Sequence, residues 1–186
     1  VLFRSFLRSL SLTSIFFIST RLAGRISTID LAAHQVLLQF WLFSSFFIDG
    51  VAVVANIYVS RWSGRGATEK TKWAIRECFY QGLAFGLLFT AIYFFAQGYF
   101  IPIFSKDLKV LSKINELWPL IVWSQVINAL AFVIDGVLFG AREYRYLRNM
   151  MLFIFLAVFL PFAVLAHSTS QIIYLWSGLV AVSFAR

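Results

Sequence analysis

The segment LAAHQVLLQFWLFSSFFIDGVAVVANIYV, residues 31–59, is apolar over most of its length and contains a single acid, Asp49. A hydrocarbon layer about 30 Å thick is crossed by about 20 apolar residues in a helix. The segment exceeds that length and is followed by a connector, residues 61–72, that is rich in glycine, lysine and arginine. We therefore predict a membrane-spanning helix that protrudes beyond the bilayer.

Five further apolar stretches occupy most of the remaining chain. The 186 residues are 61% hydrophobic and 13% charged, with a mean hydropathy of +0.83, which excludes a water-soluble globular domain. We predict an all-α, polytopic membrane protein in which residues 1–186 form a six-helix transmembrane bundle. The other five stretches are residues 6–22, which form the least hydrophobic one, and residues 74–104, 117–140, 150–166 and 172–184.

Prolines and chain ends refine these boundaries. Pro102 is expected to break the third helix near its end, and residues 105–116 are expected to form a short polar connector. Pro119 is then expected in the first turn of the fourth helix, and Pro161 is expected to kink the fifth. Because the chain opens at Val1 with a helical pattern and stops just after an apolar stretch, we interpret it as a fragment whose last helix is cut short.

The basic residues lie between the apolar stretches and form no continuous patch, so we expect membrane lipid as a partner and no nucleic acid. Positive charge is retained on the cytoplasmic side of a membrane. We therefore predict that both ends of the fragment are cytoplasmic in a cell (inner) membrane, and that the second and fourth helices run parallel. Alternate connectors carry eleven basic residues on one side (Arg4, Arg8, Arg61, Arg65, Lys70, Lys72, Arg76, Arg142, Arg145, Arg148, Arg186) and five on the other (Arg21, Arg25, Lys106, Lys109, Lys113).

Two acids lie inside predicted helices and share a local sequence. Phe46-x-Ile48-Asp49-Gly50-Val51 is matched by Phe132-x-Ile134-Asp135-Gly136-Val137. A charged carboxylate inside a membrane costs on the order of 2.5 to 3.5 kcal/mol on insertion scales, so it needs a compensating interaction. The glycine after each acid permits the close approach of a neighbouring helix.

Other polar residues share a helix face with each acid. At about 100° per residue, one face of the second helix and one face of the fourth are polar. Lipid cannot satisfy such groups, so we expect both faces to line the protein interior or a water-filled cavity. The candidate residues for an ion or substrate site are Gln35, Gln39, Asp49 and Asn56 on the second helix, with Ser60 on the same face, and Ser124, Asn128 and Asp135 on the fourth.

Two interpretations of the acids stay open. In the first, Asp49 and Asp135 line a cavity and bind a proton, a sodium ion or a cationic substrate. In the second, each carboxylate stabilises the weakened backbone beside its glycine or pairs with a neighbouring helix. No cofactor, metal site or catalytic residue is expected, because Cys78 is the single cysteine and His34 and His167 lie far apart. The six tryptophans are expected to anchor helix ends at the membrane interfaces, and His34 to be a hydrogen-bonded interfacial residue.

Three groups of residues resemble the multidrug and toxin extrusion (MATE) transporters. Leu31-Ala32-Ala33-His34-Gln35, followed by Asp49-Gly50 and Ala55-Asn56, is similar to the family's eighth helix. Phe104-Ser105-Lys106-Asp107 is similar to its "FT-x-D" segment, and residues 135–142 with 144–149 are similar to its tenth helix and the following cytoplasmic turn. The resemblance covers nearly all of the chain and is greatest to the branch of the DNA-damage-inducible protein F.

The resemblance implies one lobe of a twelve-helix fold, helices seven to twelve, and therefore a partner lobe N-terminal to it. It also implies a cation-coupled (H⁺ or Na⁺) antiporter that exports drugs or other cationic and lipophilic compounds by alternating access, and not an enzyme. Another branch of the family has an acid at the position of Asn128. Two alternatives remain: a flippase for lipid-linked glycans from the same superfamily, and an intramembrane aspartyl protease in which Asp49 and Asp135 share a proton.

Overall fold

The computed structural model describes residues 2–186, with side chains from Phe6 onward, so Val1 and the side chain of Arg4 lie outside the described residues. The described chain is helical apart from short connectors and contains no strand. This confirms the predicted all-α bundle. The helices are α1 (Leu2–Ile26), α2 (Thr28–Ser63), α3 (Thr68–Phe95), α4 (Gln97–Phe104), α5 (Leu108–Gly140), α6 (Tyr144–Phe153), α7 (Leu160–Thr169) and α8 (Ile172–Ala185), with the π-helical turn η1 (Ile154–Phe159) joining α6 to α7.

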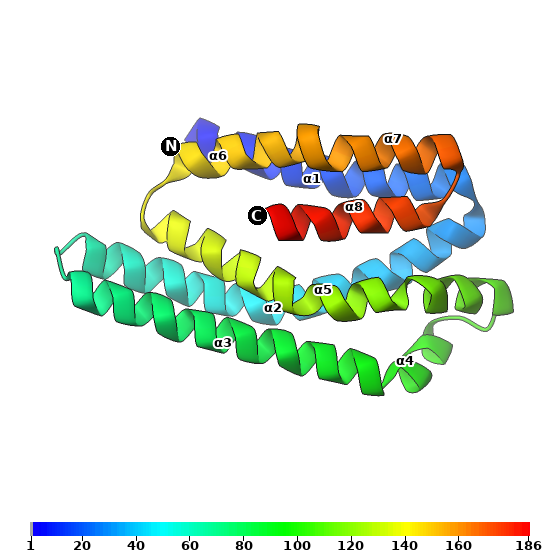
Figure 1. Cartoon of the computed structure of the whole chain (residues 1–186), viewed down its shortest axis with the longest axis horizontal. Helices are drawn as coiled ribbons and strands as arrows, with labels where there is room; N and C mark the ends of the chain where they lie inside the picture. The colour runs from blue at the N-terminus through cyan, green and yellow to red at the C-terminus, as the bar shows by residue number, and fades with distance from the viewer. Residues whose placement is uncertain (1) are drawn as a thin grey trace.

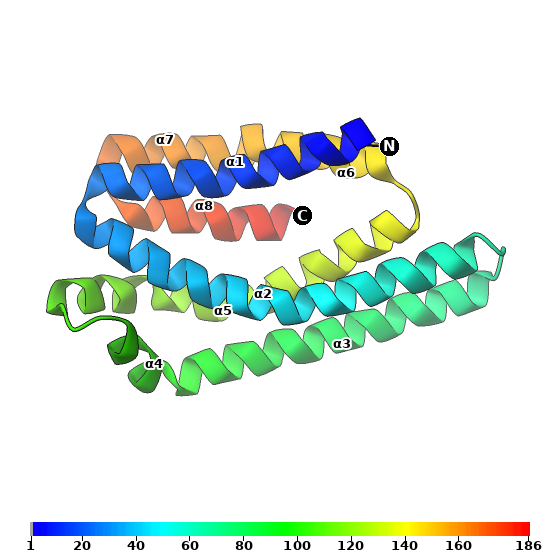
Figure 2. The same cartoon turned by 180° about the vertical axis from the view of Figure 1, so that it is seen from behind.

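The helices form two layers (Figures 1 and 2). One layer contains α2, α3 and α5, with α4 at its end, and the other contains α1, α8 and the continuous α6–η1–α7 rod. The most extensive contact is between α2 and α5, which lie side by side and run in the same direction, as predicted for the second and fourth helices.

Four helices among the described residues are long and apolar enough to cross a membrane. They are α2, α3, α5 and the α6–η1–α7 rod, whereas α8 is apolar but shorter. The first helix, expected as the least hydrophobic span, is absent from this set. The chain is therefore a helical membrane bundle in which α1 contributes a more polar element.

Two predicted boundaries were wrong. The third stretch does not continue to Phe104, because the helix breaks at Ala96 and α4 follows. Gly98, which weakens a helix locally, lies two residues after the break, and Pro102 lies inside α4. Of the segment 105–116, only residues 105–107 form a connector. Asp107 caps α5 by accepting a hydrogen bond from the Lys109 backbone N–H at 2.8 Å. The helix α5 therefore starts about two and a half turns earlier than predicted, and Pro119 lies in its interior.

Close contact between α2 and α5 depends on one glycine of the repeated sequence. A Cβ atom at Gly136 would clash with the backbone of Ala52, so only glycine allows this approach. A Cβ atom at Gly50 would meet nothing within 4 Å. The predicted role of the glycines is therefore confirmed for Gly136 and wrong for Gly50.

Tryptophans occupy two kinds of environment. Trp118 and Trp176 are each only 1% exposed and belong to the core, where the Trp118 indole donates a hydrogen bond to the Tyr93 carbonyl at 3.0 Å. Their predicted role as interfacial anchors was wrong. Trp73 and Trp123 are exposed, as anchors would be. His34 is fully buried, lies 3.3 Å from the Thr20 hydroxyl and packs against Trp176.

Candidate binding cavity between the two helix layers

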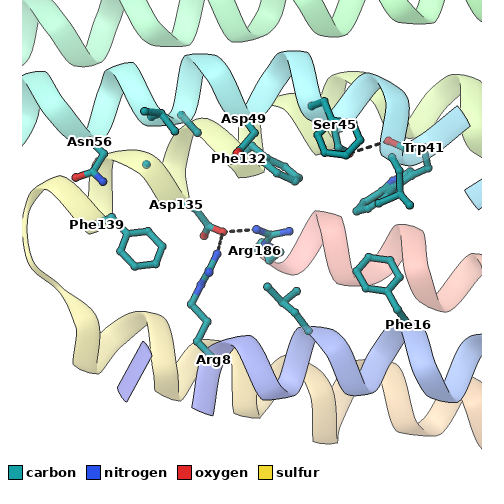
Figure 3. A pocket seen from close by; sticks show the side chains of 16 residues that line it. Arg8, Phe16, Trp41, Ser45, Asp49, Asn56, Phe132, Asp135, Phe139 and Arg186 are labelled. Atoms are coloured by element: carbon teal, nitrogen blue, oxygen red, sulfur yellow. Dashed lines mark hydrogen bonds and ion pairs between the residues drawn. The ribbon is translucent and has the colours of Figure 1, made fainter. Parts of the chain in front are cut away.

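A cavity of about 480 Å³ opens between the two layers (Figure 3). It is lined by side chains of α1, α2 and α5 and by Arg186, which follows α8. Most of the wall is apolar, and its aromatic residues are Phe16, Trp41, Phe46, Phe132 and Phe139. Four charged residues also line it: Arg8, Asp49, Asp135 and Arg186. Their formal charges add to zero, so the cavity is a mainly apolar chamber with several aromatic side chains and balanced charge.

Asp135 lies on the α5 wall and is engaged by two arginines. It is 4% exposed, and its Oδ2 accepts hydrogen bonds from the guanidinium groups of Arg8, at 2.5 Å, and Arg186. Figure 3 shows Arg8 reaching it from α1 and Arg186 from the end of α8. Because a buried carboxylate needs a partner of opposite charge, these contacts explain how the acid is tolerated in the bundle.

Each arginine also lies over an aromatic ring of α5. The guanidinium carbon of Arg8 is 4.7 Å from the Phe139 ring centre, and that of Arg186 is 5.0 Å from the Phe132 ring centre. Such cation–π contacts hold the planar guanidinium groups in place. The Arg8–Asp135–Arg186 cluster therefore ties α1 and the end of α8 to α5, across the two layers.

Asp49 has the same flanking sequence as Asp135 but a different environment. It projects from α2 into the same cavity, its residue is exposed, and it forms no ion pair with any described side chain. Asn56 lies about two turns further along α2 and lines the cavity as well. Asp49 is therefore the carboxylate of the cavity that remains open to a ligand.

A second group of buried polar residues connects the helices beside the cavity. Ser44 donates a hydrogen bond to Oε1 of Gln125 at 2.6 Å, which joins α2 to α5. The Asn128 amide donates to Ser45 at 3.2 Å and accepts from Ser183 of α8 at 3.5 Å. These contacts satisfy polar groups that lipid could not, and they hold three helices together.

The structure brings together only part of the predicted site. Asp49, Asn56 and Asp135 line one cavity. Asn128 and Ser124 are buried outside it, and Ser124 donates its hydroxyl to the Ile121 carbonyl of its own helix. The other predicted members do not line it either: Gln39 is exposed and Gln35 and Ser60 are half-buried.

The sequence interpretation missed both arginines of the cavity. Arg8 and Arg186 were interpreted as basic residues that flank membrane helices, but both side chains form ion pairs with Asp135. A helix with low hydrophobicity that starts with arginine is the one signal that could have indicated a buried partner for an intramembrane acid. Among the described residues there is no group of three or more histidine, cysteine, aspartate or glutamate side chains that could hold a metal ion.

Comparison with known proteins identifies the family. The MatE family model matches residues 5–165. The chain is 32% identical over 173 residues to Protein DETOXIFICATION 42 of Arabidopsis thaliana, covering 93% of this chain and 33% of that protein. It is 30% identical over 176 residues to the Probable multidrug resistance protein NorM of Brucella suis, covering 91% of this chain and 37% of that protein. It thus spans about a third of the length of these curated relatives, and no solved structure matches it. With the family match extending over most of the bundle and the cavity, the chain belongs to the MatE family, that of the multidrug and toxin extrusion (MATE) proteins.

Proposed function

We propose that the chain is the C-terminal six-helix lobe of a cation-coupled antiporter that exports drugs or other cationic and lipophilic compounds. The relatives are named for detoxification and multidrug resistance, and each is about three times as long as this chain. Membership of the family supports a transporter and gives no support for an enzyme. The partners of this lobe are then an N-terminal lobe of the same protein, membrane lipid, a small-molecule substrate and H⁺ or Na⁺.

The observation that carries the proposal is the aromatic cavity with Asp49 in its wall. Aromatic faces attract organic cations, and a carboxylate supplies the opposite charge. Asp135 is paired with Arg8 and Arg186, whereas Asp49 forms no ion pair with the described side chains. We therefore assign the contact with the cationic group of a substrate to Asp49 and the positioning of the cavity wall to Asp135.

The position of the cavity between two helix layers supports a mechanism of alternating access. A ligand shifts a conformational equilibrium only by its different affinity for the two states. In our proposal, a proton or Na⁺ and the substrate compete for Asp49, and rocking of this lobe against its partner lobe exposes the cavity to one side of the membrane and then the other. Release of the substrate would then be driven by entry of the cation.

A flippase for lipid-linked glycans is a second candidate, favoured by one observation. Arg8 and Arg186 place two guanidinium groups in the cavity wall, and guanidinium groups bind phosphates well. Both groups already contact Asp135, which makes the export of cationic compounds the better-supported function. The same contacts argue against an aspartyl protease, because a carboxylate held by two arginines is poorly placed to share a proton with Asp49.

The test is ethidium efflux from cells that express the full-length protein, at matched membrane expression. We expect efflux by the wild type, loss of most efflux in Asp49→Asn, and unchanged efflux in Glu143→Gln. Glu143 is a matched control because it is an exposed acid outside the cavity. No efflux by the wild type above cells with the empty vector would contradict the export of cationic compounds and favour the flippase.

A further inference from the structure

The end of the bundle that carries the α2–α3 turn has a basic and aromatic surface that the cavity does not use. In Figures 1 and 2 this turn lies farther out than the α5–α6 connection at the same end. α2 contains 36 residues and α3 contains 28. At 1.5 Å per residue these helices are about 54 Å and 42 Å long, so both exceed a hydrocarbon layer of about 30 Å. The α2–α3 hairpin must therefore reach the headgroup region.

The tip of the hairpin is a compact, hydrogen-bonded turn. The backbone N–H groups of Arg65 and Ala67 both donate to the Trp62 carbonyl, at 3.1 Å and 3.0 Å. Gly66 adopts a positive φ of 68°, a backbone conformation that favours glycine. The charged side chains of the turn are thus presented from a defined backbone.

Three aromatic residues join the two helices just inside this turn. Tyr58 and Trp62 of α2 stack with ring centres 4.9 Å apart, and Trp62 lies 5.9 Å from Trp73 of α3. Tyr58 is 38% exposed and Trp73 is 50% exposed, so the group is open to its surroundings. Amphipathic rings of this kind settle at the level of lipid headgroups.

The cations of the hairpin exceed its acids. Of the five basic residues, Lys72 is paired with Glu69 at 3.0 Å and Arg76 lies 3.9 Å from Glu77. Arg61, Arg65 and Lys70 are exposed and form no ion pair with the described side chains. The hairpin therefore carries three positive charges that remain available to an anionic partner.

The neighbouring surface identifies that partner as a lipid. On α2, Val54 and Ile57 are exposed apolar residues outside the cavity lining, and they lead directly into the aromatic group. An acyl chain would lie along these residues while its headgroup phosphate lies near the cations. We propose that the α2–α3 hairpin binds anionic phospholipid headgroups, through Arg61, Arg65 and Lys70 beside the Tyr58–Trp62–Trp73 group.

The experiment measures lipid enrichment around the full-length protein in phosphatidylcholine nanodiscs. One sample contains a fixed fraction of phosphatidylglycerol with brominated acyl chains, and a second contains the same fraction of brominated phosphatidylcholine. Because bromine quenches tryptophan fluorescence at short range, the quenching measures how much brominated lipid lies next to the protein. We expect phosphatidylglycerol to quench more strongly than phosphatidylcholine, and we expect this difference to fall as the salt concentration is raised. Near an anionic surface each basic residue contributes about fivefold in affinity.

The variants separate the hairpin from general charge. In the triple variant Arg61→Gln/Arg65→Gln/Lys70→Gln, brominated phosphatidylglycerol should quench tryptophan fluorescence little more than brominated phosphatidylcholine does. Arg21→Gln/Arg25→Gln/Lys106→Gln removes three exposed cations elsewhere and should keep the stronger quenching by phosphatidylglycerol. Equal quenching by the two lipids in the wild type would overturn the proposal and leave the patch to a different partner, such as a protein. An unchanged preference in the hairpin variant would also overturn it.

Discussion

Asp49 and Asp135 show how one local sequence produces two environments. Both acids follow isoleucine and precede glycine, but Asp135 faces α1 and α8 while Asp49 faces open cavity. The arginine that contacts Asp135 from α1 is 127 residues away in the chain. No pattern within either repeat contains that information, because it depends on which helices pack around each acid.

We predict that Asp135→Asn destabilises the protein. The change leaves the part-buried Arg8 and Arg186 without their counter-charge, and breaking a buried ion pair costs about 3 to 5 kcal/mol. Thermal unfolding of the full-length protein in detergent should show a clear loss of stability. Asp49→Asn should unfold close to the wild type, since its carboxylate is exposed. Equal unfolding temperatures for the two variants would refute the structural role of Asp135.

Asn128, a predicted site residue, is buried beside the cavity and does not line it. Asn128→Ala removes its hydrogen bonds with Ser45 and Ser183, and such contacts between membrane helices are worth about 0.6 kcal/mol on average. We expect a small loss of stability and a nearly unchanged affinity for cationic substrates. A large loss of affinity at unchanged stability would place Asn128 in the binding site instead.

Among the elements, the contact between α2 and α5 sets the geometry of the cavity. Gly136 permits this contact, and its counterpart Gly50 faces open space. We predict that Gly136→Ala destabilises the protein by about 1 to 3 kcal/mol through overpacking. Gly50→Ala should be neutral or stabilise α2 by about 0.5 to 1 kcal/mol through helix propensity. Unfolding in detergent compares the two variants, and similar losses for both would contradict the observed packing.

Hydropathy predicted the helical bundle, and the alternation of basic connectors between the two sides of the membrane predicted the parallel course of α2 and α5. Hydropathy misplaced the start of α5 because Asp107 and the Lys113–Glu116 pair stabilise polar helical turns outside the apolar stretch. It also missed the break at Ala96, since the apolar pattern continues through α4. Within the site it found Asp49, Asn56 and Asp135, whereas Arg8 and Arg186 resembled flanking charges until their side chains were located.

For the whole molecule, the distribution of basic residues predicts its orientation. The exposed arginines and lysines of the α2–α3 turn and of the start of α6 lie at one end of the bundle. By the positive-inside rule this end should face the cytoplasm. In a full-length protein whose cysteines, including Cys78, are replaced, a membrane-impermeant maleimide should label Lys106→Cys in intact cells and Arg65→Cys only after permeabilisation. The reverse pattern would contradict this orientation.

The central claim is that the cavity binds organic cations through Asp49, and direct binding tests it best. The measurement is equilibrium binding of tetraphenylphosphonium, a lipophilic cation, to the purified full-length protein in detergent. We predict that Asp49→Asn weakens binding by about tenfold or more, equivalent to about 1.4 kcal/mol, while Glu143→Gln binds as the wild type does. Equal affinities for the wild type and Asp49→Asn, with both proteins folded, would contradict the claim.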